Sequence, residues 1–544
     1  MMITLLSLYI VKIIVKLNKL ICFSILCTVS ITNAYGAYTY EYLQRISTDS
    51  IYHSSSWKKL IHYENGKSVI NNDSDFFLSS EGYKNPKAEY IATLKAILNS
   101  DKKDDNHAIC RYPARFNYIV NSLNLAKDRF PNPRCIDYQE YLKKVPLDNI
   151  YIVFAAENNQ SPSSMLGHTF LKISGQDENV TRQHSFSYFA ALDNANSLKF
   201  YIDVMTAGLD GAYVLSPYQT KADEYLFGEK RSLWEFELKL SSEEKEKLKQ
   251  HLWELKGKNI RYKFITHNCN TALMSILKVA SEDFIMETEK PFTTPVEYIQ
   301  NLQQRGKISD ITLEPSVSQK NVIKKFGLNY IGNAPKPTRF SLQQDFSHNI
   351  TNIGFSPVYQ DIRDISDAYF PDLESKIIDV SFNYLGKHQK FIIDNVDILK
   401  MASVIDYPTT DSYSKFFRLG FENDLFAENT ELKPVVEFGL GVGKRISSTT
   451  FYILPKAGYH YDNFSNFYLV PQIGAITRIS NKAKIINSYE KYFNSKKDNK
   501  GFEEKYNLYL GYNISGNMDL YLDYSHYSKA TYSDSFVMGF SLHF

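Results

Sequence analysis

An alternation of apolar and polar side chains runs through the sequence from about residue 320 to its end. Two segments show it most clearly, with these apolar positions on one face: Tyr506, Leu508, Leu510 and Tyr512 in the first, and Phe536, Met538, Phe540, Leu542 and Phe544 in the second. Successive side chains of a strand point to opposite faces, so the pattern predicts strands with one apolar face. Strands of about ten residues with aromatic residues near their ends are typical of a transmembrane β-barrel.

A soluble β-sandwich is the alternative, because its strands alternate in the same way. The sequence finishes on Phe544, with apolar residues at every second position before it. This ending resembles the terminal strand that the outer-membrane barrel assembly machinery recognises, and it favours the barrel. Counting the alternating segments from about residue 324 predicts an antiparallel barrel of roughly twelve strands, an even number being expected.

The N-terminus has the pattern of an export signal. Lys12, Lys16 and Lys19 precede the apolar run LICFSILCTVSI (residues 20–31), and TNA (residues 32–34) offers small residues for cleavage. The run is too short for an ordinary membrane-spanning helix. An earlier apolar stretch at residues 3–11 leaves an uncleaved anchor as an alternative. We therefore expect an exported protein with a signal peptide at residues 1–34.

Length and composition fit a protein of several domains. A chain of 544 residues is too long for one ordinary domain. The net charge of only +2 gives no reason to expect a nucleic-acid partner. Aromatic residues make up 14% of the chain, including 40 Tyr and 35 Phe, which suits many half-buried strands.

Export changes what the cysteines can do. Cys22 and Cys27 would leave with the signal peptide, so that Cys110, Cys135 and Cys269 remain. An oxidising compartment favours pairing two of the three. Cys110 and Cys135 lie in one segment, and the simplest assignment is a disulfide between them with Cys269 free.

Two further modules precede the barrel. Residues 38 to about 145 are polar and follow a helical pattern. From about residue 148 short strands alternate with helices, and SSEEKEKLKQHLWEL opens with a capping box from Ser241 to Glu244. The expected organisation is a multidomain α+β chain, divided as follows: signal peptide 1–34, helical lead-in module 35–145, α+β domain 146–312 and outer-membrane β-barrel 320–544.

Cys269 is the first candidate functional residue. In THNCNTALMSIL (residues 266–277) it lies where a polar loop gives way to an apolar run with helical spacing. A thiol in the first turn of a helix feels the positive end of the backbone dipole and free amide N–H groups, which favour the thiolate. A nucleophile is therefore one interpretation, and an inert buried cysteine is the other.

The middle of the chain resembles a known family. SSMLGHTFLKI, SYFAAL, GLDGAYVLSPY, DEYLFGEKRSLWEFELKLSSEE, LWEL and YKFITHNCNTAL occur in this order between residues 148 and 310. In this order they resemble the Lnb N-terminal periplasmic domain family, which is similar to circularly permuted papain-like thiol folds. The resemblance implies a histidine at the start of an early strand and an asparagine–cysteine pair at the start of a later helix, and His168 and Asn268-Cys269 match these positions.

The resemblance implies that His168 is the base that accepts the thiol proton. Without the resemblance, a strand histidine bonded to backbone is equally plausible. Two residues on or beside the next strand are candidates for orienting the imidazole, His184 and Ser187. His184 is the better hydrogen-bond acceptor, and Ser187 lies closer to the polar position of the family.

Residues near the cysteine and before the histidine are candidates for binding an oxyanion. They are the Asn268 amide or the Cys269 backbone N–H, with Ser164 and Met165 shaping the same region. Ordinary turn chemistry is the other interpretation of that loop. A zinc site that joins His267, Cys269 and His168 is weaker, because no clustered Cys/His spacing is present. Neither a metal nor a cofactor is expected.

These features lead to a functional hypothesis. The family's named member moves a fatty acyl chain within bacterial lipoproteins, and the resemblance implies a Cys269 thioester. We expect an acyltransferase or hydrolase of the outer membrane, its soluble domain in the periplasm and its substrate a membrane lipid or lipoprotein. One alternative is a cell-wall peptidase or amidase of the same fold. Another is a barrel channel or scaffold with a non-catalytic binding domain.

Overall fold

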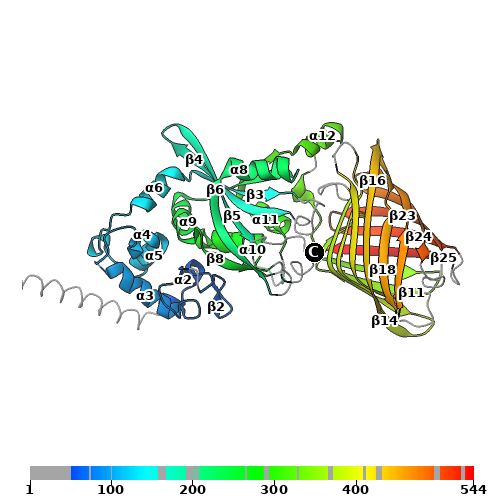
Figure 1. Cartoon of the computed structure of the whole chain (residues 1–544), viewed down its shortest axis with the longest axis horizontal. Helices are drawn as coiled ribbons and strands as arrows, with labels where there is room; N and C mark the ends of the chain where they lie inside the picture. Colours follow the sequence, from blue (N-terminus) through cyan, green and yellow to red (C-terminus); the bar gives the residue numbers. More distant parts are fainter. Residues whose placement is uncertain are drawn as a thin grey trace, which may run out of the picture.

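The chain is described here by a computed structural model. It covers residues 51–72, 75–99, 101–156, 167–190, 203, 207–263, 266–286, 293–326, 330–365, 372–407, 412–423, 432–462, 464–494, 503–528 and 533–544. The expected signal peptide at residues 1–34 lies outside these residues. A helical module, an α+β domain and a β-barrel follow one another along the chain (Figure 1).

The first module is helical, as the pattern at residues 38–145 predicts. Its elements are η1 (Ile51–His53), α2 (Ser55–Leu60), β1 (Tyr63–Glu64), β2 (Lys67–Ser68), α3 (Pro86–Leu98), α4 (Ala108–Arg111), α5 (Pro113–Ser122), η2 (Lys127–Arg129) and α6 (Ile136–Lys144). Helix α3 begins at Pro86 because the Asn85 side chain accepts a hydrogen bond from the Ala88 N–H. The predicted Cys110–Cys135 disulfide is confirmed, with the two Cα atoms 5.2 Å apart.

A buried charge network joins this module to the next domain. Arg115 on α5 is fully buried, and its guanidinium lies 2.8 Å from Glu89 on α3 and 3.4 Å from Glu254 on α9. Glu254 also accepts hydrogen bonds from the backbone N–H groups of Ala114 and Arg115. Because each buried charge has partners on another element, the helical module and the α+β domain share one core.

The α+β domain contains a seven-stranded antiparallel sheet with the order β8-β6-β5-β4-β3-β7-β9. The strands and helices of this domain are β3 (Asn149–Ala155), β4 (His168–Asp177), β5 (Val180–Ala190), β6 (Leu209–Pro217), α8 (Tyr218–Asp223), η4 (Glu224–Gly228), β7 (Leu233–Leu238), α9 (Ser242–Leu255), β8 (Asn259–Tyr262), α10 (Cys269–Ala280), η5 (Glu282–Phe284), α11 (Pro295–Gln304) and β9 (Ile308–Glu314). The predicted capping box at Ser241 and Glu244 is present at the start of α9. Helices α9 and α10 pack on one face of the sheet, and α8 and η4 pack on the other.

Alternation along the central strands decides which side chains meet which helices. On β4, Leu171 and Ile173 share a core with α10 residues such as Leu273. Phe170, one position away, packs instead against Tyr218 and other residues of the α8–η4 side. A shift of one residue along β4 therefore exchanges one face of the sheet for the other.

The C-terminal domain is a closed barrel of twelve antiparallel strands, as the alternation predicts. After α12 (Val317–Phe326) and η6 (Ile331–Asn333), its strands are β10 (Arg339–Asp345), β11 (Ile350–Ser356) with β12 (Val358–Gln360), β13 (Leu373–Leu385), β14 (Lys390–Ser403), β15 (Ser414–Asn423), β16 (Leu432–Ile446), β17 (Thr449–Ile453) with β18 (Lys456–Asp462), β19 (Phe464–Val470) with β20 (Gln472–Ser480), β21 (Ala483–Lys491) with β22 (Phe493–Asn494), β23 (Glu504–Ser515), β24 (Met518–Tyr527) and β25 (Asp534–His543). β25 pairs with β10 and closes the ring, which rules out a two-sheet sandwich.

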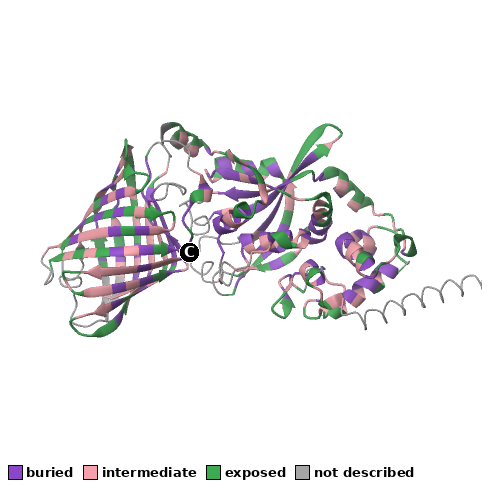
Figure 2. Cartoon of the chain, turned by 180° about the vertical axis from the view of Figure 1, so that it is seen from behind, coloured by how far each residue is buried: buried purple, intermediate pink, exposed green. Residues whose placement is uncertain are grey.

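The outer face of the barrel is apolar and its inner face is charged. Phe438 and Leu440 on β16 are 58% and 60% exposed, whereas Glu437, which precedes Phe438, is buried and lines the lumen. Exposed and buried residues alternate in this way along the barrel strands (Figure 2). An apolar outer surface around a polar interior is the arrangement that a lipid bilayer requires of a barrel.

Candidate active site

Helix α10 begins where the sequence predicts, at the candidate nucleophile. Asn268 is the N-cap, and its side-chain oxygen accepts a hydrogen bond from the Thr271 N–H at 3.0 Å. Cys269 is therefore the first residue of the helix, where backbone N–H groups are not used within the helix. Leu273, Ile276 and Leu277 bury the apolar face of α10 and fix the helix on the sheet.

The Cys269 sulfur has polar neighbours from two elements. Cys269 is 7% exposed, and it is the free cysteine of the described residues. The backbone N–H and the hydroxyl of Thr169 on β4, together with the Asn270 N–H, act on the sulfur and lower the pKa of its thiol. The Thr169 hydroxyl is buried and has no hydrogen-bond partner in the described part of the chain, so it is free to donate to a charge that develops at the sulfur. These donors favour a negative charge on the sulfur.

Burial acts against that charge. It raises the pKa of the Cys269 thiol, and the donors from Thr169 and Asn270 and the positive charge of Arg231 offset this only in part. The resting group is consequently a thiol. A reaction at this sulfur therefore needs a base or a change in its surroundings.

His168 lies at the start of β4, as the sequence predicts, with its ring among aromatic rings. The centroid distances are 6.1 Å to Phe170, 5.6 Å to Phe189 and 6.1 Å to Tyr225. Its Nε2 atom is buried without a hydrogen-bond partner among the described residues. Burial, aided by the charges of Arg231 and Lys221, lowers the pKa of His168 to about 3. The imidazole is therefore neutral at ordinary pH and, in these surroundings, a weak base.

The two candidate residues lie at the same end of the sheet, on opposite faces of β4. Thr169 points to α10 and to the Cys269 sulfur, whereas His168, the preceding residue, shares its face with Phe170 and with the η4 residue Tyr225. The Thr169 side chain beside the sulfur and the aromatic rings around the imidazole thus lie on different faces of β4. A hydrogen bond between them requires the His168 side chain to move from its aromatic surroundings.

Arg231 connects the two sides of this region, although it was not predicted from the sequence. Its guanidinium donates hydrogen bonds to the carbonyls of Ala155 and Ala156 at the end of β3, at 2.7 and 2.6 Å. Its charge acts on both Cys269 and His168. The arginine lies within the segment DEYLFGEKRSLWEF that carries the family resemblance, and this is the only signal that could have drawn attention to it.

Three tyrosines interact electrostatically with the sulfur. The charge of a Cys269 thiolate contributes to raising the pKa values of Tyr188, Tyr225 and Tyr262, after burial as the main cause. The Tyr188 hydroxyl is buried without a hydrogen-bond partner among the described residues. The Tyr188 and Tyr262 rings lie 5.5 Å apart. These rings give the thiol aromatic surroundings, and the Tyr188 hydroxyl is available to bind a ligand.

The two candidates for orienting His168 differ in position. His184 pairs with Ile173, five residues along β4 from His168, a separation of about 16 Å at the usual rise per residue. His184 therefore lies outside the hydrogen-bonding range of His168 in this structure. Ser187 is buried two residues from Phe189, on the same face of β5, and its hydroxyl has no partner in the described segments.

The structure places some of the residues that were candidates for binding an oxyanion or a metal ion. Ser164 and Met165 lie outside the described residues. The Asn268 side-chain oxygen caps α10, as described above, and the Cys269 N–H belongs to the first turn of the helix. His267 pairs its ring Nδ1 with the Thr266 hydroxyl at 2.9 Å. Among the described residues, the group of side chains placed to share a metal ion does not include His168, His267 or Cys269.

The barrel and the soluble domain define the class of the protein. It is an outer-membrane β-barrel protein that carries an α+β domain in the periplasm. Residues 137–305 match the model of the Lnb N-terminal periplasmic domain family, so the α+β domain is a domain of that family. Two domains of unknown function match residues 49–122 and 332–543. Among the helices described, none is long and apolar enough to cross a membrane.

Comparison with other proteins adds little about activity. A search of curated proteins found no match. Among solved structures, the NanC porin is similar at 9% identity over 38% of this chain and 100% of its own, with a TM-score of 0.26. The KdgM porin matches at 8% identity over 38% of this chain and 98% of its own, with a TM-score of 0.25. An outer membrane channel from Pseudomonas putida F1 matches at 6% identity over 39% of this chain and 96% of its own, with a TM-score of 0.26.

Proposed function

We propose that the protein is a periplasmic thiol enzyme that the barrel holds at the outer membrane, and that it transfers or hydrolyses acyl groups of membrane lipids or lipoproteins. The observation that carries the proposal is the environment of the Cys269 sulfur, at the first residue of a helix and beside donors from Thr169 and Asn270. Cys269 is also free among the described residues, although an oxidising compartment favours the pairing of cysteines. The periplasmic-domain match supports the same chemistry.

In the proposed reaction, His168 Nε2 accepts the Cys269 proton and the thiolate attacks the carbonyl carbon of an ester. The first N–H of α10 and the Thr169 hydroxyl donate hydrogen bonds to the oxyanion. The C–O bond breaks, the leaving alkoxide takes the proton from the imidazolium, and a thioester forms on Cys269. An amine or water then attacks the thioester, gives up a proton through His168, and releases the cysteine.

The proposed pairing of His168 with Cys269 requires a conformational change. The imidazole would rotate at the first residue of β4, next to Gly167, whose φ of +75° favours glycine. A Cβ at Gly167 would lie 2.1 Å from the Phe154 ring, so this position admits glycine alone without a shift of the ring. A bound acyl chain beside Tyr188 and Tyr262 would be the trigger, because the charge of the Cys269 thiolate acts on both phenols.

Lipid turnover by single-site variants tests this proposal. The purified full-length protein would be reconstituted with a diacyl phospholipid and a lipopeptide carrying a free amine, and lyso-lipid would be measured by mass spectrometry. Cys269→Ala and His168→Ala should abolish lyso-lipid release. His184→Ala is the matched control, since this histidine lies on β5 at about 16 Å along the sheet. Equal loss in both histidine variants would contradict the role of His168, and release by Cys269→Ala would contradict the thiol mechanism.

A further inference from the structure

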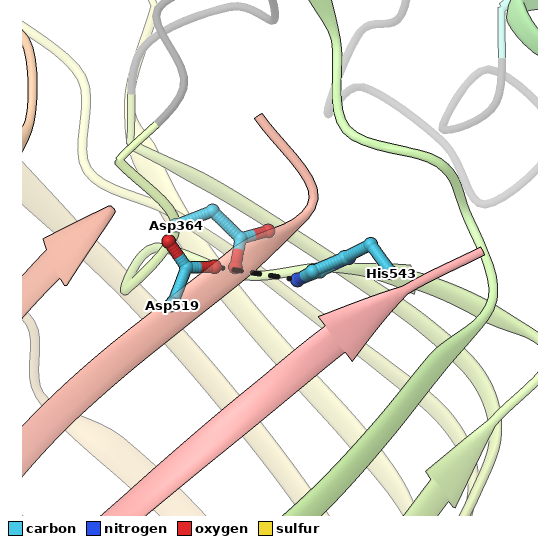
Figure 3. Close-up of side chains that lie close together, drawn as sticks. All are labelled: Asp364, Asp519 and His543. Atoms are coloured by element: carbon cyan, nitrogen blue, oxygen red, sulfur yellow. Dashed lines mark ion pairs between the residues drawn. The ribbon is translucent and has the colours of Figure 1, made fainter. Parts of the chain in front are cut away.

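A second group of side chains lies in the barrel, far along the chain from Cys269. Asp364 follows β12, Asp519 is the second residue of β24, and His543 ends β25. One ligand atom from each residue lies within 4.8 Å of the other two. Figure 3 shows the three side chains converging from separate parts of the wall. His543 and Asp519 are 2% and 6% exposed.

Hydrogen bonds fix the state of the His543 ring. Its Nδ1 lies 3.2 Å from the backbone carbonyl of Lys336, which can only accept a hydrogen bond. The proton of a neutral ring therefore sits on Nδ1, and Nε2 presents a lone pair. This buried Nε2 has no hydrogen-bond partner in the described residues, and it faces the Asp519 carboxylate at 3.5 Å.

Each of the two carboxylates accepts a hydrogen bond from a neighbouring group. Asp519 Oδ1 accepts a hydrogen bond from the Asn513 amide at 2.7 Å, which leaves Oδ2 directed at His543. Asp364 Oδ2 accepts the Asp361 N–H at 2.8 Å. Within the described ranges, no Lys or Arg side chain forms an ion pair with Asp364 or Asp519. Among the described residues the three acceptors thus converge without an ion pair to Lys or Arg, while the Lys484 ammonium donates to the backbone carbonyl of Asp364.

We propose that Asp364, Asp519 and His543 bind a divalent transition-metal ion, with Zn²⁺ as the best fit. Two ligands of a tetrahedral zinc ion lie ~3.3–3.4 Å apart when each bond is about 2.0–2.1 Å. The His543–Asp519 separation of 3.5 Å is close to this value. A direct charge-assisted hydrogen bond between the two groups would be shorter, at about 2.7–2.9 Å.

The donor set also argues for the kind of ion. An imidazole nitrogen with two carboxylate oxygens suits Zn²⁺ or a related transition metal, whereas Ca²⁺ and Mg²⁺ prefer oxygen alone. Three protein ligands leave a fourth position for water. Arg339, whose positive charge acts on His543, weakens cation binding but lies against the Tyr359 ring rather than on the carboxylates.

The site lies where the barrel meets its connector to the periplasmic domain, residues 330–338. The backbone carbonyl of Lys336 pairs with His543 Nδ1. The backbone N–H of Lys336 donates a hydrogen bond to the Asn517 side-chain oxygen at 3.2 Å. Gln300 on α11 donates hydrogen bonds to the connector carbonyls of Gly332 and Ala334. A metal that orients His543 would therefore also fix the connector on the barrel rim, near the end of the chain in Figure 1.

Metal analysis of the full-length protein tests the proposal. The chain would be purified without a histidine tag in the Cys269→Ser background, stripped with a chelator and titrated with Zn²⁺. We expect a single bound Zn²⁺, lost or weakened at least ~10-fold in Asp519→Asn and His543→Ala. His526→Ala is the matched control, because His526 lies on β24 beside Asp534 but is half exposed.

X-ray absorption at the zinc edge separates this site from others. Coordination by nitrogen and oxygen with a histidine signature, unchanged in His526→Ala, supports the proposal even if His543→Ala folds poorly. The proposal is overturned if the wild-type barrel binds no Zn²⁺ and His543 titrates as an imidazolium paired with Asp519. It is also overturned if Asp519→Asn binds Zn²⁺ as well as the wild type does. Either result leaves the proposed thiol chemistry untouched.

Discussion

Replacing Thr169 with valine removes one hydroxyl beside the Cys269 sulfur and keeps the shape of the side chain. The Thr169 backbone N–H and the Asn270 N–H remain as donors to the sulfur. The hydroxyl has no hydrogen-bond partner among the described residues, so its removal leaves no new unpaired group. The variant therefore isolates one interaction that stabilises the thiolate.

The size of the effect follows from the strength of that interaction. A hydrogen bond to a charged group contributes about 1.5–3 kcal/mol. At a fixed pH below the thiol pKa, the thiolate fraction should fall by the corresponding factor of about 10–100. Because the thiolate is the reactive form, alkylation of Cys269 should slow by a similar factor.

Alkylation by a small reagent such as iodoacetamide, followed by peptide mass spectrometry, measures this rate. Thr271→Val is the matched control, because the Thr271 hydroxyl donates to the Asn268 carbonyl within the first turn of the same helix. The control should react at nearly the wild-type rate. Equal rates for Thr169→Val and the wild type over the whole pH range would refute the role assigned to the hydroxyl.

Three further predictions concern stability and the barrel. Arg115→Met leaves the carboxylates of Glu89 and Glu254 buried without their cation, and should lower the free energy of unfolding of the soluble domains by about 3–5 kcal/mol in urea titrations. The pKa of His168 is about 3 in the folded protein, so the unfolded chain binds more protons between that pH and about 6.5. Stability should therefore fall as the pH falls through this window, and it should fall less in His168→Phe by circular dichroism. Arg363 lies 3.3 Å from Asp523 inside the lumen, where a cavity of about 610 Å³ remains. We expect little ion conductance in planar bilayers and an increase in Arg363→Ala, whereas large open-pore currents in the wild type would contradict a charge-filled lumen.

The barrel was predictable because its pattern depends on adjacent residues alone. Leu508 and Leu510 face outward and Asn507 faces the lumen, as the period-two alternation requires. The start of α10 at Cys269 was predictable for a similar reason, since an asparagine cap and an apolar stripe are local signals.

The details of both sites were not predictable in the same way. Whether His168 or Thr169 faces α10 depends on which surface of β4 the helix covers, and either choice fits the sequence. The His184 position required the register between β4 and β5. The group formed by Asp364, Asp519 and His543 depends on barrel closure, which brings β24 and β25 beside a segment more than a hundred residues earlier in the chain.

The central claim is that Cys269 carries an acyl group during turnover. Intact-mass and peptide mass spectrometry after incubation with a defined diacyl phospholipid measure this most directly. The account predicts a mass increase of one fatty acyl chain on the Cys269 peptide, removed by hydroxylamine at neutral pH and absent in Cys269→Ala. An unmodified Cys269 in a protein that still releases lyso-lipid would contradict it.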